Sequence, residues 1–152
     1  MKIRVEVEPD LKETEVVIRC NEVNETVIQL QNLINQAEKE KKRIVFYKDD
    51  TEFFIPLSNV LFFETSGEQV WAHTADEEFL VKYKLYELEN MLPDMFMRVS
   101  KSTILNTAKI YSILRNLTAA SKIEFYKSKK TVFVSRFYYK ELKNKLSLEM
   151  ER

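Results

Sequence analysis

Short runs in which hydrophobic and polar residues alternate occupy most of the chain after residue 43. Such period-2 alternation is typical of strands with one buried face. The segments between these runs carry Asp, Ser, Asn or Gly, which favour reversal of the chain. The predicted strands cover residues 43–48, 52–55, 60–65, 69–74, 78–83, 96–99, 110–114, 123–126 and 131–134. The pattern therefore predicts a domain that is mainly β.

Two stretches of the same region repeat their hydrophobic residues at helical spacing instead. Residues 85–92 predict a short helix that Pro93 ends. Residues 136–148 predict a last helix with Tyr139, Leu142 and Leu146 on one face. Both helices are short compared with the β-rich region around them.

The first 42 residues predict a small ββα extension, followed by a domain over residues 43–152. Residues 1–8 alternate in the manner of a strand, Pro9 and Asp10 break the pattern, and residues 15–20 read as a second strand. A helix is expected over about 24–42, with Asn24 as its N-cap and an apolar stripe of Val27, Leu30, Ile34 and Ala37. An amphipathic helix must bury its stripe, so we expect it to lie on the following domain or on a second copy of the chain.

Charge divides the chain into an acidic and a basic part, although the total formal charge is zero. Residues 1–95 hold eleven Lys or Arg and twenty Asp or Glu, whereas residues 96–143 hold eleven Lys or Arg and only two acids. Clustered cations do not specify a fold, and their main physical use is to bind a polyanion. The charge pattern therefore favours nucleic acid as a partner.

Composition excludes several other classes of protein. Because Cys20 is the single cysteine, a framework of disulfide bonds and a zinc site with several cysteine ligands are both excluded. His73, the only histidine, has no second His or Cys as a co-ligand, so we expect a structural role and no metal or cofactor. The aromatic residues Phe53, Phe54, Phe62, Phe63 and Trp71 are expected in the core. No apolar run is long enough for a membrane span and the start does not resemble a secretion signal, so a soluble cytoplasmic protein is expected.

Two polar segments within the basic part carry candidate chemistry. In the first, a strand breaks at Ser100-Lys101-Ser102 before apolar sequence resumes. Hydroxyls and a lysine bind phosphate oxygens, and a lysine also reaches guanine O6 or N7. In the second, Arg136 follows Ser135 where the last strand becomes a helix, and a helix start offers free N–H groups to an anion. If only one such segment were present, its residues could be ordinary polar residues of the surface. That interpretation is weaker for two segments within one basic region.

These segments carry a family resemblance over about residues 43–148. Together with residues 55–57, 60–65 and 84–89, the Phe96-Met97-Arg98-Val99-Ser100-Lys101-Ser102 segment and the Val134-Ser135-Arg136 segment resemble a LytTR-type DNA-binding domain. The acidic extension is similar to that of stand-alone regulators in the family that lack a receiver domain. The resemblance implies a compact fold of about ten short strands with short helices.

The resemblance also implies that loops, rather than a recognition helix, enter major grooves of double-stranded DNA that carries a repeat. One contact then falls on Lys101, flanked by Ser100 and Ser102, and another on Arg136 with Phe137. A third falls on the loop at residues 66–69, where this chain departs from the family because Glu68 repels phosphate, and Gln69 is therefore favoured. Further candidates for DNA contact in the basic region are Lys127, Lys129 and Lys140. Lys127 and Lys129 are expected at the tip of a hairpin, where they are either solvated or in contact with phosphates.

The leading hypothesis is therefore a sequence-specific transcriptional regulator that forms a homodimer at least on DNA. The alternative is a protein-interaction module whose acidic N-terminal part binds a regulatory partner, such as an accompanying membrane protein. A metal-dependent nuclease comes third, because the basic segment holds only Glu124 and Glu141 as acids. No catalytic group is proposed, and no enzyme is expected.

Overall fold

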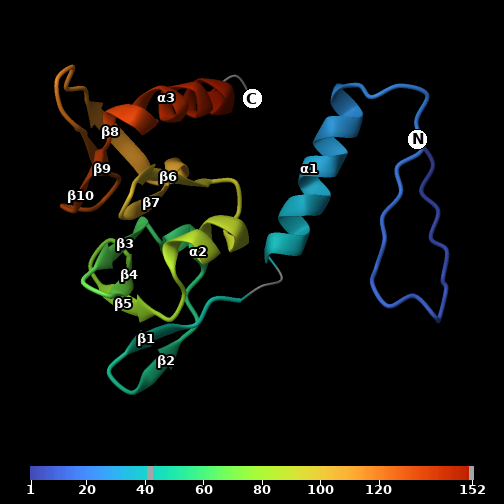
Figure 1. The fold of residues 1–152 in the computed structure, drawn as a ribbon, viewed down its shortest axis with the longest axis horizontal. Helices are drawn as coiled ribbons and strands as arrows, with labels where there is room; N and C mark the ends of the chain where they lie inside the picture. Colours follow the sequence, from blue (N-terminus) through green and yellow to red (C-terminus); the bar gives the residue numbers. More distant parts are fainter. Residues whose placement is uncertain (41–42, 151–152) are drawn as a thin grey trace. The chain divides into compact units, whose positions relative to one another are not determined.

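The structure, a computed structural model, describes residues 1–40 and 43–150 (Figure 1). The chain divides into two compact units, Met1–Ile34 and Asn35–Arg152. The division falls inside the first helix, α1 (Glu25–Glu40). The boundary expected from the sequence, between residues 42 and 43, adjoins residues 41 and 42, which lie outside the described residues.

The larger of two sheets in the second unit has seven antiparallel strands in the order β2-β1-β5-β4-β3-β7-β6. Hairpins join β1 to β2, β3 to β4 and β6 to β7, and β3 pairs with both β4 and β7 at the centre of the sheet. The strands are β1 (Phe46–Lys48), β2 (Thr51–Phe53), β3 (Phe62–Ser66), β4 (Gln69–His73), β5 (Glu78–Val81), β6 (Phe96–Ser100) and β7 (Thr103–Asn106).

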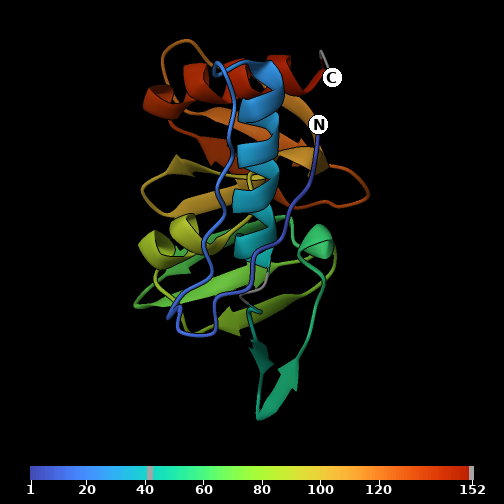
Figure 2. The ribbon, with the colours of Figure 1, turned by 90° about the vertical axis from the view of Figure 1, so that its right-hand side faces the viewer.

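The smaller sheet has three antiparallel strands in the order β10-β9-β8. These are β8 (Ile110–Leu114), β9 (Ser121–Phe125) and β10 (Thr131–Val134). Helix α2 (Leu85–Met91) packs on β3, β6 and β7, and helix α3 (Arg136–Met150) packs on β6. Figures 1 and 2 show the small sheet and α3 on one side of the large sheet. Short 3-10 turns at Leu57–Asn59 and Thr107–Lys109 lead into β3 and β8.

Strands β3, β6 and β7 separate two hydrophobic cores, because successive side chains of a strand point to opposite faces. Phe63 and Ile104 belong to the core with α2, whereas their neighbours Phe62 and Leu105 belong to the core with the small sheet and α3. All four residues of β7 are buried. The cores therefore fix the position of the β6–β7 hairpin from both sides.

The mainly β fold predicted from the sequence is confirmed, with ten antiparallel strands among the described residues. The last helix is confirmed too, since Leu142 is fully buried and Tyr139 and Leu146 pack against the same core. The alternation did not predict β7, since a strand buried on both faces shows no alternation. Phe54, expected in the core, is instead exposed.

The N-terminal extension differs from the predicted ββα arrangement. The helix is present as α1, and the side chain of Asn24 accepts a hydrogen bond from the Val27 amide, as expected of an N-cap. Residues 1–24, however, contain no regular strand, although the expected turn at Pro9 and Asp10 is formed. A strand needs a ladder partner and a surface for its apolar face, and Ile3, Val5 and Val7 are 88%, 82% and 84% exposed in this single chain.

Candidate nucleic-acid interface

Three chain reversals that are far apart in the sequence meet at one edge of the second unit, which we call the three-turn edge. They are the β3–β4 turn, the β6–β7 turn and the junction of β10 with α3. The amide of Thr65 donates to the carbonyl of Ser102 at 2.8 Å, which joins the first two. The amide of Ser135 donates to the carbonyl of Val99 at 2.9 Å, which joins the junction to β6. Backbone hydrogen bonds therefore hold all three in one fixed arrangement.

The β6–β7 turn presents Lys101 and Ser102 to solvent between the paired residues Ser100 and Thr103. The hydroxyl of Ser100 accepts from the Ser102 amide at 3.2 Å and lies 3.4 Å from the Ser102 hydroxyl. These bonds shape the turn through local side-chain contacts with the backbone. Two hydroxyls consequently lie together at the tip, in the turn that also carries the exposed Lys101.

Arg98 supports this turn from below, a role that the sequence patterns did not reveal. Its guanidinium donates to the carbonyl of Ser100 at 2.8 Å and to that of Lys101 at 2.5 Å. A third bond, 3.1 Å long, reaches the carboxylate of Glu89 on α2. The side chain of Arg98 is only 19% exposed. Arg98 therefore positions the turn, and its own charge is already paired.

The β3–β4 turn is a two-residue hairpin loop of Gly67 and Glu68 between the paired residues Ser66 and Gln69. Gly67 has a φ of +64°, which matches a type II′ turn with glycine at its first central position. Open space surrounds the missing Cβ, so the backbone conformation and not crowding favours glycine here. Both Glu68 and Gln69 are exposed, so both remain candidates for contact.

The junction after β10 places Arg136 at the first residue of α3. The carbonyl of Ser135 accepts from the amides of Tyr138 and Tyr139, so Ser135 occupies the N-cap position. Arg136 and Phe137 are exposed, Phe137 by 82%. Lys140 is exposed and lies one helical turn after Arg136, on the same face of α3. The helix start thus adds two cations to the three-turn edge.

The cations at this edge are not neutralised by ion pairs within the described part of the chain. Among the ion pairs of the described residues, none includes Lys101, Arg136 or Lys140. Phosphate groups of a polyanion can therefore approach these cations without first breaking an internal pair.

The structure separates two of the predicted residues, Lys127 and Lys129, from this edge. They belong to the β9–β10 turn, at the opposite end of β10 from Arg136. That turn is attached to the β4–β5 turn, since the hydroxyl of Ser128 donates to the carbonyl of Ala75 at 2.9 Å. Lys130 donates to the carbonyl of Glu77 at 2.6 Å. Lys127 and Lys129 are both exposed beside it.

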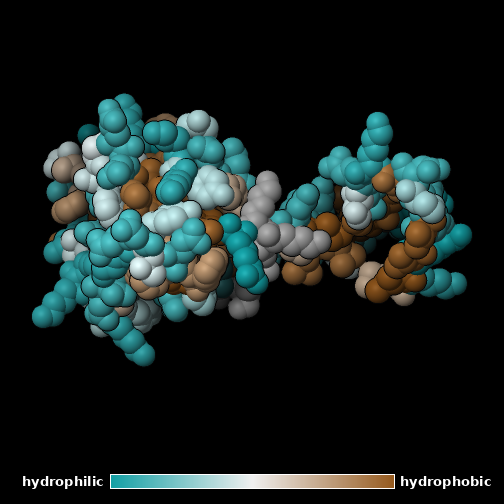
Figure 3. All heavy atoms as spheres, turned by 90° about the horizontal axis from the view of Figure 1, so that it is seen from below, coloured by the Kyte–Doolittle hydropathy of each residue, from teal (hydrophilic) through white to brown (hydrophobic). Residues whose placement is uncertain are grey.

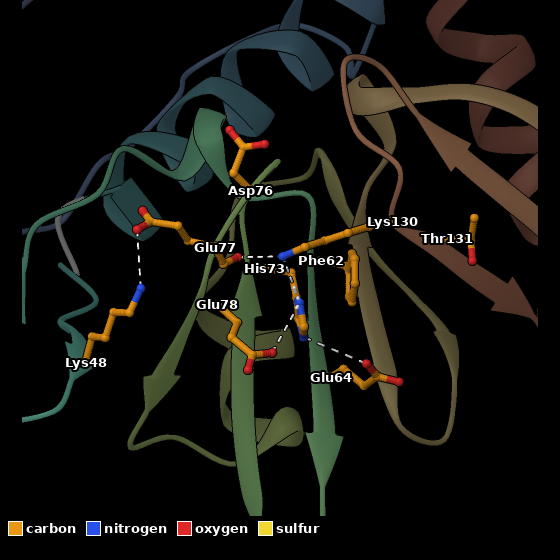
Figure 4. A pocket seen from close by; sticks show the side chains of 9 residues that line it. All are labelled: Lys48, Phe62, Glu64, His73, Asp76, Glu77, Glu78, Lys130 and Thr131. Carbon is orange, nitrogen blue, oxygen red and sulfur yellow. Dashed lines mark hydrogen bonds and ion pairs between the residues drawn. The ribbon is translucent and has the colours of Figure 1, made fainter.

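An open hollow of about 580 Å³ lies at this second location (Figure 4). Four carboxylates are among its lining side chains, which are Lys48, Phe62, Glu64, His73, Asp76, Glu77, Glu78, Lys130 and Thr131. Carboxylates repel the phosphates of nucleic acid. The surroundings of Lys127 and Lys129 are therefore much less favourable to DNA than the three-turn edge.

His73 has a structural place in the hollow. Its ring stacks on Phe62 with centroids 4.3 Å apart, and its Nδ1 lies 3.2 Å from the Lys130 ammonium group. Burial lowers the pKa of His73 to about 4, helped by the charge of Lys130 and opposed by Glu78. The ring is thus neutral at pH 7, and the carboxylates of Glu64 and Glu78, at 3.8 and 3.9 Å, do not form ion pairs with it there. No cluster of His, Cys, Asp and Glu among the described residues can hold a metal ion.

Comparison with known proteins agrees with this geometry. A sequence model described as the LytTr DNA-binding domain matches residues 50–147, which include all three reversals. The chain belongs to the LytTr DNA-binding domain family. This family is a DNA-binding domain and not an enzyme class. The resemblance seen in the Ser100–Ser102 and Ser135–Arg136 segments is therefore confirmed at the level of the family.

Relatives of similar length have been named as regulators. Proteins of Staphylococcus aureus strains NCTC 8325 and MRSA252, each named an uncharacterised HTH-type transcriptional regulator, are 30% identical over 148 residues. Each alignment covers 97% of this chain and 99% of the relative. HTH denotes a helix-turn-helix, whereas in the described part of this chain five strands separate α2 from α3.

A solved structure shows the same fold. It is the LytTr DNA-binding domain of a Bacillus cereus protein named as a methyl-accepting/DNA response regulator. The two structures superpose with a TM-score of 0.63 at 24% sequence identity. The match covers 69% of this chain and 97% of that domain.

None of the helices in the described residues is long and apolar enough to cross a membrane.

Proposed function

We propose that this protein is a transcriptional regulator that binds double-stranded DNA in a sequence-specific manner through the three-turn edge. The observation that carries the proposal is the pair of backbone hydrogen bonds, Thr65 to Ser102 and Ser135 to Val99. These bonds hold exposed Lys101 and Arg136 at one edge of a LytTr domain. A fixed spacing of cations and hydroxyls is what recognition of a duplex requires, since phosphate contacts set the register and base contacts read the sequence.

Each reversal has a separate task in this proposal. The β6–β7 turn presents Lys101 to base edges in a major groove, with the hydroxyls of Ser100 and Ser102 beside it. At the start of α3, Arg136 binds either a phosphate of the DNA backbone or a guanine base. Phe137 packs against deoxyribose groups, and Lys140 binds a further phosphate. The β3–β4 turn adds Gln69, whose amide both donates and accepts. Glu68 accepts only, so its possible base partner is a cytosine amine.

The site on DNA contains a repeat, and two copies of the protein bind it. One domain offers a single edge of three turns, and this surface is small compared with a DNA site that consists of two repeated half-sites. The proposed regulator is therefore a homodimer on DNA. A regulatory partner, for example an accompanying membrane protein, would bind the acidic N-terminal unit, whose residues 1–34 hold four Lys or Arg and seven Asp or Glu.

Binding to genomic fragments tests the proposal. Full-length protein is first used in footprinting on genomic DNA to find a protected site, and fluorescence anisotropy then gives its affinity. Lys101→Ala and Arg136→Ala should each weaken binding to that site by about 1–3 kcal/mol. Lys127→Ala is the matched control, because Lys127 is an exposed lysine of the same basic segment at the other end of β10. Equal affinities for wild type, Lys101→Ala and Arg136→Ala would contradict the proposed site.

A further inference from the structure

The N-terminal unit carries hydrophobic side chains that the other residues of this unit leave exposed. Ile3, Val5 and Val7 are each more than four-fifths exposed, and Val16 and Val17 are 59% and 65% exposed. Figure 3 shows hydrophobic side chains reaching the surface over much of this unit. Exposed apolar patches of this kind mark interaction sites. Residues 1–8 also run as open chain without a ladder partner in a strand. Of their carbonyl groups, that of Glu8 accepts from the Leu11 amide at 3.2 Å in the turn that follows.

Residues 2–8 are complementary to themselves when two copies run in opposite directions. With Val5 opposite Val5 of the second copy, Ile3 lies opposite Val7 on the apolar face. On the other face Lys2 lies opposite Glu8, and Arg4 lies opposite Glu6. Twofold symmetry repeats each pair, which gives four cross-strand ion pairs and a continuous apolar row. Opposite charges that face each other across antiparallel strands stabilise the pairing.

Other pairings of this segment are less favourable. A parallel, in-register pair would place each charge opposite the same charge. The in-chain hairpin that aligns the apolar positions sets Val5 opposite Ile18, and it then places Arg4 opposite Arg19 and Glu8 opposite Glu15. Like charges directly opposite each other destabilise a strand pair. Charge complementarity therefore selects a second copy of the same segment.

We propose that residues 2–8 are a dimerisation strand, which pairs antiparallel with residues 2–8 of a second copy about Val5. The interface is isologous, because the same residues contribute on both sides of the twofold axis. It gives the exposed Ile3, Val5 and Val7 a cover and gives residues 2–8 a ladder partner. The inference deepens the homodimer of the proposed function, but it involves none of the residues proposed to touch DNA.

Reversal of the charges tests the pairing in the absence of DNA. Sedimentation equilibrium would compare the full-length wild type with Lys2→Glu/Arg4→Glu and with Glu6→Lys/Glu8→Lys. Each double variant makes residues 2–8 uniformly acidic or basic, so each should dimerise at least roughly tenfold more weakly than wild type. The fourfold variant that combines them restores self-complementarity and should dimerise like wild type. An equimolar mixture of the two double variants should give a mixed dimer.

Either of two results would overturn this inference. One is a wild type that remains monomeric at all attainable concentrations, and the other is a pair of double variants that dimerise as strongly as wild type. The affinity of the double variants for DNA would be measured separately. Loss of the dimer with retained contact to a half-site separates this proposal from the proposed DNA site.

Cysteine cross-linking tests the register. Cys20 is exposed and is first replaced by Ser, so that each variant holds one thiol. Val5→Cys would place two thiols opposite each other, with Cα atoms about 4.5–5.5 Å apart, within reach of a disulfide. Ile3→Cys, the matched control, would place its two thiols four residues out of register, about 13 Å apart. With diamide as oxidant, Val5→Cys should form a covalent dimer at least roughly tenfold faster than Ile3→Cys. Equal rates would exclude the proposed register.

Discussion

At the scale of single residues, Arg98 fixes the shape of the β6–β7 turn because its guanidinium binds two consecutive backbone carbonyls. It is mostly buried, it is paired with Glu89, and it lies three residues before Lys101. Lys101 in contrast is exposed and belongs to no ion pair of the described residues. The two cations therefore differ in their tasks, since Arg98 positions the turn and Lys101 is available to DNA.

Substitution of the two residues should separate these tasks. Arg98→Ala removes three hydrogen bonds, so the free energy of unfolding should fall by about 1–3 kcal/mol, and DNA binding should weaken as well. Lys101→Ala should weaken DNA binding and leave the free energy of unfolding within about 0.5 kcal/mol of wild type. Urea denaturation and fluorescence anisotropy measure the two quantities. An Arg98→Ala variant that binds DNA like wild type would show that the turn keeps its shape without this support.

His73 makes stability depend on pH. Its pKa is about 4 in the folded chain and near 6.5 when unfolded, so the unfolded state binds more protons between these values. Stability from the neutral ring is complete above pH 6.5 and is lost as the pH falls toward 4. Between pH 7.5 and 5 the loss should be about 2 kcal/mol. Urea denaturation of wild type and of His73→Gln at pH 7.5 and pH 5 separates the contribution of His73 to the free energy of unfolding from that of the carboxylates. An equal loss in both proteins would assign the pH dependence to other groups.

At the scale of elements, α3 contributes one fully buried residue to the core that it shares with the small sheet, and Tyr138, Tyr139 and Leu146 pack around that core. Leu142 is completely inaccessible to solvent, whereas Leu148, later on the same helix, is 62% exposed. Leu142→Ala should lower the free energy of unfolding by about 2–5 kcal/mol through lost burial and a cavity. Leu148→Ala, the matched control, should change it by less than about 0.5 kcal/mol. Thermal and urea denaturation measure both. Similar effects of the two substitutions would mean that α3 is held differently.

The alternation of residues along the chain predicted the elements that have one exposed face. It predicted β10 and α3 well because their buried positions recur at the strand and helix periods, and it also predicted β8. It did not predict β7, which is buried on both faces. It predicted strands over residues 1–8 and 15–20, but a strand also needs a partner, and the single chain supplies none to the described residues there. Periodicity reports the face that a residue prefers and not whether a neighbour is present to cover it.

The candidate site divides in a similar way. Exposed cations and hydroxyls at turns, such as Lys101 and Arg136, can be recognised from composition and position. Their proximity depends on backbone bonds between β3, β6, β7 and the start of α3, which no local pattern encodes. For the same reason the sequence grouped Lys127 with Arg136, although they lie at opposite ends of β10. The role of Arg98 was missed because two of its three hydrogen bonds are to backbone carbonyl groups, which every residue carries.

At the scale of the whole molecule, we propose that charge determines which side of the second unit meets DNA. Residues 96–143 hold eleven Lys or Arg against two acids, and Glu64, Asp76, Glu77 and Glu78 gather around the hollow beside the β9–β10 turn. In the proposed function, these charges attract a duplex to the three-turn edge and repel it from the hollow, so that they orient the approaching DNA before any base is read.

The dependence of binding on salt tests this orientation, because each neutralised phosphate changes the slope of log K against log salt concentration by about 0.9. Lys140 lies one turn of α3 beyond Arg136, so Lys140→Ala should reduce the slope by about one phosphate and weaken binding to all sequences alike. Lys127→Ala removes the same charge beside the acidic hollow and should leave the slope unchanged. Anisotropy titrations between about 50 and 200 mM KCl, on a specific and an unrelated duplex, measure both. If Lys127→Ala reduced the slope as much as Lys140→Ala, the duplex would also contact the β9–β10 turn, and the proposed orientation would be wrong.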